Sequence, residues 1–327
     1  MLRIFRVPDA RSGRLLPVGI LALGVFLLGL TGSALAQDDN LEDLLQQVGE
    51  DYAIAYTSPF LYAFGPNQNS AMYQTAEIPW HRITFGIGIK AMAAHLNEDD
   101  QNFRKVLRNV DISDYISGVP GGTIGDVVLS GPTIFGNTEQ KGKAVGYVSG
   151  IPVYEQETIP GLIETRFVPL ATPEAYVGGI AGLKLTLRYF PEIDLGDYGK
   201  TKYFGWGLQW NANGVLKNLP LDLMVGFFDQ QLKVGTLLDT NARTYFAGAS
   251  KDFGMITPYG GFALEESDMK VAYVETVSGT DINFKVDGLQ DSRITLGATL
   301  NLGVKLNVEA AFGNKITNYS AGLMFGL

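Results

Sequence analysis

From residue 81 onward, apolar and polar residues alternate in a series of short segments. Apolar side chains occupy every second position within residues 83–93, 181–189, 204–210, 221–227, 294–302 and 304–312. This period of two predicts strands with one apolar face and one polar face. The segments are about ten residues long and turn residues separate them, a layout typical of transmembrane β-barrels.

The last nine residues form the clearest of these segments. One face is apolar and consists of Tyr319, Ala321, Leu323, Phe325 and Leu327. A chain that stops on such a strand is typical of an outer-membrane protein that closes its barrel. We therefore expect the barrel assembly machinery to recognise this strand. Leu327 stands where such proteins usually end in phenylalanine, which weakens the assembly signal, although Phe325 keeps an aromatic ring nearby.

Seven charged residues fall on the face opposite the apolar one: Lys90, Lys184, Arg188, Asp222, Arg293, Lys305 and Glu309. A charge on the lipid side at mid-membrane would cost roughly 2–4 kcal/mol, so we expect these side chains to line a polar lumen. The alternative is a soluble β-sandwich that carries them on its outer face. The N-terminal leader described below and the terminal strand favour the barrel.

Residues 81–327 amount to 247 positions. At about 20 residues per strand and connection, they predict an all-β, antiparallel transmembrane barrel of about 12 strands, within a range of about 10–14. The alternation is weak in residues 96–160, which contain a Gly/Pro-rich stretch at 118–122. We expect a long surface loop there, or two strands with poor periodicity.

Residues 37–80 precede the barrel pattern. Leucines and a valine within Asn40–Gly49 are spaced as in a short amphipathic helix. Residues 51–80 are mixed and contain Pro59, Pro66 and Pro79, so they do not read as one lipid-facing strand. We expect residues 37–80 to form a hatch, a plug-like segment inside or beneath the barrel; the alternative is a periplasmic tail outside the pore.

The hatch also contains a group of aromatic and apolar residues that are candidate contacts for an apolar ligand: Phe60, Tyr62, Phe64, Met72 and Tyr73. The same residues would serve equally well to pack the hatch against the barrel wall. The sequence leaves both readings open.

Residues 1–36 have the layout of a secretory signal peptide. Four arginines precede an apolar stretch from Leu15 to Leu30, and Ala34-Leu35-Ala36 forms a small-x-small cleavage site. Its removal leaves 21 basic and 33 acidic side chains, a net charge of −12, which argues against a nucleic-acid partner. There is no cysteine. We expect export to the bacterial outer membrane, with outer-membrane lipids as partners.

Two stretches carry a family resemblance. Residues 52–85 run from a short predicted strand through a proline and a Gly/Asn-rich stretch to a Tyr-x-Thr-Ala box and the first barrel strand, and residues 160–191 continue the layout. Over nearly the whole mature chain this resembles an uncharacterised family of bacterial outer-membrane proteins. The order of hatch and barrel is also similar to that of the long-chain fatty-acid channels. The resemblance implies an outer-membrane barrel and names no substrate.

Chemical motifs are scarce. His81 and His95 lie at opposite ends of the first predicted strand, some 46 Å apart at about 3.3 Å per residue, and no His/Cys/carboxylate spacing fits zinc. We expect no catalytic, metal or cofactor site and no enzyme activity.

The leading hypothesis is a channel or transporter for a small or hydrophobic solute. The alternative is a non-transporting structural or adhesive barrel that acts through its surface loops.

Overall fold

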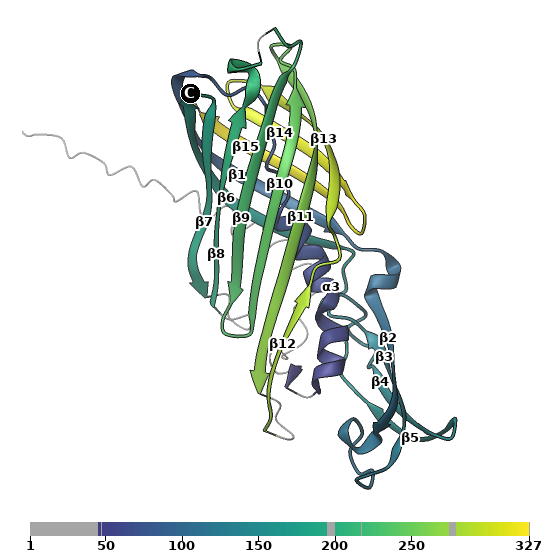
Figure 1. Cartoon of the computed structure of the whole chain (residues 1–327). Helices are drawn as coiled ribbons and strands as arrows, with labels where there is room; N and C mark the ends of the chain where they lie inside the picture. Colours follow the sequence, from purple (N-terminus) through teal and green to yellow (C-terminus); the bar gives the residue numbers. More distant parts are fainter. Residues whose placement is uncertain (1–44, 47, 195–199, 217, 275–278, 327) are drawn as a thin grey trace, which may run out of the picture.

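A computed structural model describes residues 45–46, 48–194, 200–216, 218–274 and 279–326 (Figure 1). Within these residues ten antiparallel strands pair side by side into a closed barrel. In order around the barrel they are β1 (His81–His95), β6 (Phe167–Ile180), β7 (Leu183–Asp194), β8 (Lys200–Asn211), β9 (Asp222–Val234), β10 (Leu238–Ser250), β11 (Ile256–Val274), β13 (Ser292–Asn301), β14 (Lys305–Gly313) and β15 (Thr317–Gly326).

The pairing of the first and last barrel strands closes the barrel, and the hairpin of β10 with β11 completes the ring. β15 lies against β1, with Phe325 opposite Ile87, and β10 lies against β11 along its whole length. The prediction of an antiparallel barrel closed by the C-terminal strand is therefore confirmed. The ten strands of the described barrel fall at the lower end of the expected range.

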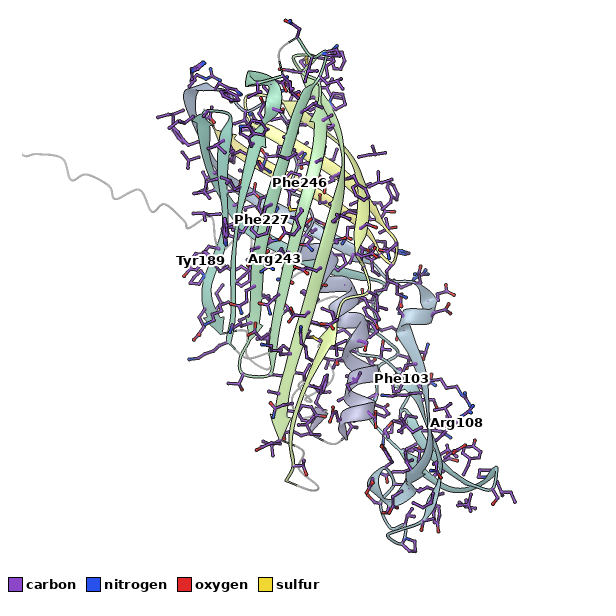
Figure 2. All side chains as sticks on the ribbon, in the orientation of Figure 1. Phe103, Arg108, Tyr189, Phe227, Arg243 and Phe246 are labelled. Atoms are coloured by element: carbon purple, nitrogen blue, oxygen red, sulfur yellow. The ribbon has the colours of Figure 1, made fainter. Side chains whose placement is uncertain are left out.

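The alternation in sequence is an alternation between the outside and the inside of the barrel. Along β8, Phe204, Trp206 and Leu208 are exposed, whereas Gly205 and Gln209 are buried. Tyr189, Phe227 and Arg243 mark the outer wall in Figure 2. Successive side chains of a strand point to opposite faces, so apolar residues outside place polar ones in the lumen.

The two ends of the barrel differ. The turn end carries the start of β1, the end of β15, and short connections at 181–182 and 302–304. The insertion end carries the long excursion between β1 and β6, and β12 (Asp281–Asp287), which pairs with the part of β11 that extends past β13. In Figure 1 the insertion end is the lower one.

The excursion between β1 and β6 forms an antiparallel sheet of four strands in the described residues, which we call the projecting sheet. Its strands are β2 (Asn102–Asp111), β3 (Ile124–Pro132), β4 (Lys143–Val148) and β5 (Ile151–Glu157), and the short helices η1 (Glu98–Gln101) and η2 (Ile112–Asp114) accompany them. The sheet extends away from the barrel (Figures 1 and 2). The sequence had suggested a loop or two weak strands here. The alternation of apolar and polar residues is weak here because these short strands have two partly exposed faces. The register between neighbouring strands is also irregular.

A single long helix, α3 (Glu50–Gln68), lies within the described part of the N-terminal segment. It packs against β1, β6, β10, β11 and β12 of the barrel and against β2. Most of the expected helix at Asn40–Gly49 lies outside the described residues. The prediction of a short strand from residue 52 is wrong, because these residues belong to α3, which also continues through Pro59 and Pro66.

Hydroxyl side chains close to the two prolines of α3 bond to helix carbonyls. Proline lacks the N–H of a helical residue. Just before Pro59, the Thr57 Oγ1 donates to the Ala53 carbonyl at 2.7 Å and the Ser58 Oγ to the Ile54 carbonyl. Pro66 stands in the last turn, where its own carbonyl accepts from Ser70 Oγ at 2.8 Å.

The first turn of α3 is bonded to the projecting sheet. The Asp51 carboxylate accepts from Lys105 Nζ at 2.7 Å and from the Tyr115 hydroxyl at 2.9 Å. Burial, followed by the neighbouring Asp51, raises the pKa of Tyr115 to about 12, so this hydroxyl stays protonated and keeps donating. One apolar core joins α3, the projecting sheet and the adjacent end of the barrel.

Candidate functional site

The barrel lumen is occupied by residues 66–80, which we call the plug. The plug leaves the end of α3, crosses the lumen and joins β1 at the turn end. Side chains of the wall bond to its backbone: Gln230 to the Gln68 carbonyl, Gln209 to that of Met72, Thr299 to that of Gln74 and Asn211 to that of Ala76, at 2.5–3.0 Å. The last part of the expected hatch, residues 66–80, therefore lies inside the barrel, bonded to its wall.

Arg188 of β7 is the centre of this network. Its Nε donates to Glu174 at 2.9 Å, and its two terminal nitrogens donate to the carbonyls of Gln68, Ser70 and Ala71 at 2.9–3.2 Å. The side chain is fully buried. A cation placed at the carbonyl end of a helix also interacts favourably with the helix dipole.

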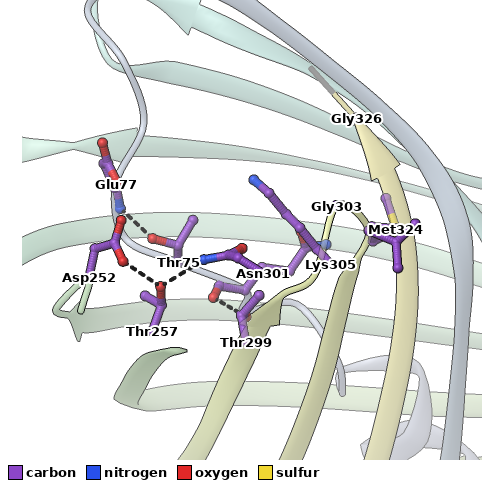
Figure 3. Close-up of a pocket in the computed structure, with 12 residues that line it drawn as sticks. Thr75, Glu77, Asp252, Thr257, Thr299, Asn301, Gly303, Lys305, Met324 and Gly326 are labelled. Carbon is purple, nitrogen blue, oxygen red and sulfur yellow. Dashed lines mark hydrogen bonds between the residues drawn. The ribbon is translucent and has the colours of Figure 1, made fainter. Parts of the chain in front are cut away.

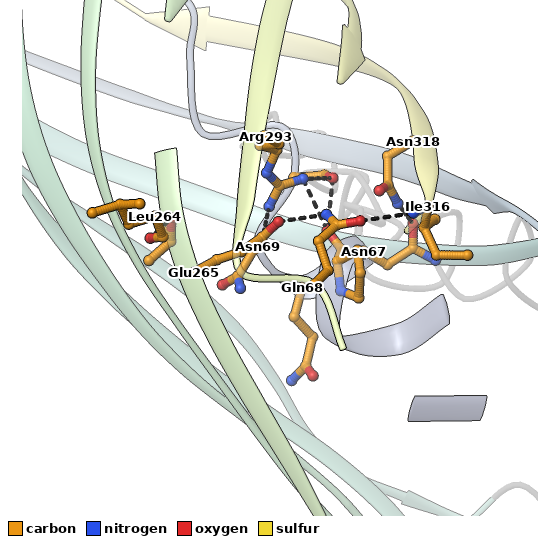
Figure 4. A network of polar contacts seen from close by, with 12 residues as sticks. Asn67, Gln68, Asn69, Leu264, Glu265, Arg293, Ile316 and Asn318 are labelled. Atoms are coloured by element: carbon orange, nitrogen blue, oxygen red, sulfur yellow. Dashed lines mark hydrogen bonds and ion pairs between the residues drawn. The ribbon is translucent and has the colours of Figure 1, made fainter. Parts of the chain in front are cut away.

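Arg293 of β13 makes a second anchor nearby (Figure 4). Its Nη1 donates to the Pro66 carbonyl at 3.1 Å and to Ser70 Oγ at 2.7 Å, and its Nη2 contacts Glu265 at 2.7 Å. Asn318 of β15 donates to the Asn67 side chain at 2.8 Å in the same region. The end of α3 is thus held by buried polar groups from opposite parts of the wall.

The carboxylate of Glu309 on β14 also holds the plug, as a hydrogen-bond acceptor. Its Oε1 accepts from the Ala71 N–H at 3.0 Å and its Oε2 from the Tyr259 hydroxyl at 3.3 Å. Ala71 has a φ of 60°, a conformation that non-glycine residues rarely adopt. The wall therefore fixes a bend in the plug directly after the helix.

The plug also packs against apolar residues of the wall. Met72 and Tyr73 form a buried cluster with Met224, Phe228, Phe246 and Tyr259. The Tyr73 ring lies edge-on to Phe246, with ring centroids 4.9 Å apart. Figure 2 labels Phe246 on β10.

The five candidate contacts for an apolar ligand are not brought together. Phe60 and Phe64 stack at 4.1 Å on α3, and Phe60 also faces Phe135 at 6.3 Å. Tyr62 lies under Lys315 Nζ at 5.5 Å. Met72 and Tyr73 belong to the separate lumen cluster described above. These residues pack α3 and the plug against their surroundings.

The seven charged residues expected to line the lumen all lie on the inward phase of their strands. Lys90, Lys184, Arg188, Arg293 and Glu309 are buried, and Asp222 and Lys305 are half-buried near the turn end. Arg188, Arg293 and Glu309 contact the plug. The sequence analysis did not identify the carboxylates that pair with the two arginines: Glu174 lies in a weakly alternating segment, and Glu265 is buried in β11.

Two pockets open where the plug reaches the turn end. The larger, of ≈ 330 Å³, lies beside Thr75, Glu77, Asp252, Asn301 and Lys305 (Figure 3). The smaller, of ≈ 110 Å³, shares Gln74, Thr75, Glu77 and Lys305 with it, and its other lining residues include Arg82 and Lys184. Both pockets end on the plug, and both walls combine polar and apolar groups.

Among the described residues, no cluster of His, Asp and Glu side chains is arranged to hold a metal ion. His81 lies exposed at the turn end of β1, and His95 packs against Phe167 at its other end, with ring centroids 4.9 Å apart. No helix in the described part of the chain has the length and apolar character needed to cross a bilayer.

Solved structures similar to this chain include a loop-deletion mutant of OmpT, an outer membrane protein of Vibrio cholerae (11% identity, TM-score 0.26, covering 75% of this chain and 99% of that one). The Ralstonia pickettii toluene transporter TbuX is 8% identical, with a TM-score of 0.24 over 81% of this chain and 98% of its own. The Yersinia pestis attachment invasion locus protein Ail is 6% identical, with a TM-score of 0.21 over 75% and 97%. Similarity this low carries no inference about function.

No curated protein matches the chain. One family model does, over residues 16–327, which is almost the entire sequence. The family has no assigned function, in agreement with the resemblance seen in the sequence. The chain belongs to the family of unknown function DUF6588.

Proposed function

We propose that this protein is a gated channel of the bacterial outer membrane, closed by its plug and opened for a small polar solute when the plug moves. The observation that carries this proposal is the polar wall beneath the plug. Threonine, asparagine, glutamine, arginine and glutamate side chains line the lumen and hold the plug backbone. The same groups would line a water-filled passage once the plug is displaced.

The outer wall supports a place in the membrane. Its exposed residues are predominantly apolar and include Phe85, Ile87, Leu185, Leu187, Trp206, Phe262, Leu296 and Leu323. Outward positions of β1 run from Ile83 to Ala93, ten residues apart. At about 3.3 Å per residue and a tilt of about 40°, they span about 25 Å along the barrel axis, the height of the apolar band of outer-membrane barrels.

A row of charges limits this band towards the insertion end. On adjacent strands in register, Arg243 contacts Asp229 at 2.7 Å and Glu266 at 3.2 Å. Outward residues beyond this row, such as Lys233 and Lys270, are polar. Short turns usually face the periplasm, so we assign the turn end to the periplasm and the projecting sheet to the cell exterior. Export by residues 1–36 and assembly through β15 complete the proposal.

The buried ion pairs favour a channel over a merely structural barrel. Replacing a buried ion pair by apolar residues of similar volume is often neutral or stabilising, so Arg188–Glu174 and Arg293–Glu265 are not needed to fill the lumen. A wall that must also face water has to remain polar. The hydrophobic-solute branch of the hypothesis loses support, because its candidate residues line no common cavity.

A second candidate function is an adhesive or structural barrel that acts through its surface. The projecting sheet favours it, since Val106, Ile124, Ile151 and Val153 are exposed although the sheet has a core of its own with α3. Under this alternative the lumen would never conduct. Conductance therefore separates the two functions.

Weakening the plug without unpairing a charge tests the channel proposal. Gln209→Leu with Thr299→Val removes the donors to the Met72 and Gln74 carbonyls. At about 1 kcal/mol per hydrogen bond, the closed state loses about 2 kcal/mol and the open fraction rises about 30-fold. The measurement is the open probability of single channels in planar bilayers.

Thr244→Val is the matched control, because the Thr244 hydroxyl bonds to the Leu264 carbonyl of the wall and not to the plug. We expect it to leave the open probability unchanged. If the double variant folds but its open probability is no higher than that of the wild type in any membrane, the channel function is ruled out in favour of the structural alternative.

A further inference from the structure

The cations inside the barrel fall into two classes. Both buried arginines are paired with a carboxylate, Arg188 with Glu174 at 2.9 Å and Arg293 with Glu265 at 2.7 Å. Three lysines of the inner wall differ: no carboxylate of the described residues lies within ion-pair distance of Lys90, Lys184 or Lys305. Lys90 has only the Asn307 side chain, at 3.4 Å.

Lys184 is the most exceptional of the three. It is only 7% exposed, yet no described residue accepts a hydrogen bond from it. Its Nζ lies 5.5 Å from the centre of the Tyr176 ring. The carboxylate whose charge attracts it, Glu174, is already bonded to Arg188 and Gln74. The charges of Lys90 and Lys305 repel it.

A buried charge without a partner is costly, and proteins normally pair it or leave it a ligand. Lys184 borders the ≈ 110 Å³ pocket at the turn end, together with Arg82 and Lys305. Glu77 is the only carboxylate among the residues that line it, so the lining has three cations and one anion. The adjoining larger pocket has the opposite balance, with Glu77 and Asp252 against Lys305.

We propose that the smaller pocket binds a small oxyanion, a carboxylate or a phosphate, which pairs with Lys184, Lys305 and Arg82. The Thr84 hydroxyl and the Tyr176 ring complete its lining. The site goes beyond the channel function, because anion binding to the closed form requires no movement of the plug. Gln74 and Thr75 also border the pocket, so the bound anion lies against the plug.

Isothermal titration calorimetry on the detergent-solubilised mature protein tests this site. Sodium phosphate and sodium acetate are titrated separately, against chloride at constant ionic strength. We expect saturable binding of at least one of them. Lys184→Met and Lys305→Met should each weaken it about tenfold or more, because each removes a charge-assisted hydrogen bond.

Lys270→Met is the control, since Lys270 is exposed on β11 at the other end of the barrel. Thermal unfolding without added oxyanion provides a second readout. Lys184→Met should unfold at the same or a higher temperature than the wild type, because it removes an unpaired buried charge. A variant that both unfolds earlier and loses binding would show a structural lysine and overturn the proposal.

Short-chain phosphatidylglycerol in the same detergent distinguishes a lipid headgroup from a free anion. Lysine-dependent binding of phosphate or acetate identifies a soluble ligand, and lysine-dependent binding of phosphatidylglycerol alone identifies a headgroup. Both outcomes support an oxyanion site. No saturable binding of any of the three probes, or equal binding by wild type and Lys184→Met, overturns it.

Discussion

Replacing Arg188 by methionine is expected to lower the free energy of unfolding by about 3–5 kcal/mol. The substitution removes the ion pair to Glu174 and the donors to three plug carbonyls, and it leaves Glu174 buried at 4% exposure without its cation. Chemical unfolding in detergent or liposomes, followed by the circular dichroism of the strands, measures the loss.

Two controls show whether burial causes the effect. Arg243→Met breaks two ion pairs on the outer wall, where the arginine side chain is 46% exposed, and should cost only about 0–1 kcal/mol per pair. Adding Glu174→Met to Arg188→Met removes the stranded charge and should recover part of the stability. Equal costs for Arg188→Met and Arg243→Met would contradict the buried anchor.

A second large effect is expected on the outside of the barrel. Ile87 is 61% exposed, and it lies midway along the outward residues of β1. If the barrel wall faced water, Ile87→Arg would change the free energy of unfolding by about 0.5 kcal/mol or less. At the middle of a bilayer it should cost about 2–4 kcal/mol, because the arginine must reach the interface or distort the lipid.

Ile151 offers a matched control on the projecting sheet. It is the same residue at 63% exposure, and it lies at the start of β5, away from the barrel wall. When unfolding is measured in lipid vesicles, Ile87→Arg should lower the free energy of unfolding clearly more than Ile151→Arg does. If both variants are as stable as the wild type, the barrel wall does not face lipid.

The sequence predicted the barrel well because a period of two is a local property. In β8 each inward position is small or polar and each outward one is apolar over most of the strand, so the face of every residue could be assigned without knowing its neighbours. The same phase placed the seven charged residues on the inner wall. The partners of those charges could not be assigned, since Arg188 and Glu174 come together only through the pairing of β6 with β7.

Helix α3 escaped prediction for two physical reasons. Its neighbours surround it, so buried residues occur all around the helix and no apolar stripe marks one face. Pro59 and Pro66 are strong helix breakers in isolation, yet both lie inside α3, which packs against the barrel and the projecting sheet. The plug after it has no periodicity at all, because its backbone bonds to the wall rather than to another strand.

The central claim is that the lumen conducts only when the plug moves, and a disulfide that fixes the plug tests it most directly. Thr75 Oγ1 and Ser250 Oγ lie 3.3 Å apart, one on the plug and one on β10, and the chain has no cysteine of its own. Thr75→Cys with Ser250→Cys can therefore form a single bond between plug and wall.

Conductance of this double variant is measured in planar bilayers before and after addition of a reductant. The single variant Ser250→Cys controls for the lost hydroxyl. We predict that the oxidised protein is silent and that reduction restores the openings seen with the single variant. Equal conductance of the oxidised and reduced forms, with the disulfide verified, would contradict a gate formed by the plug.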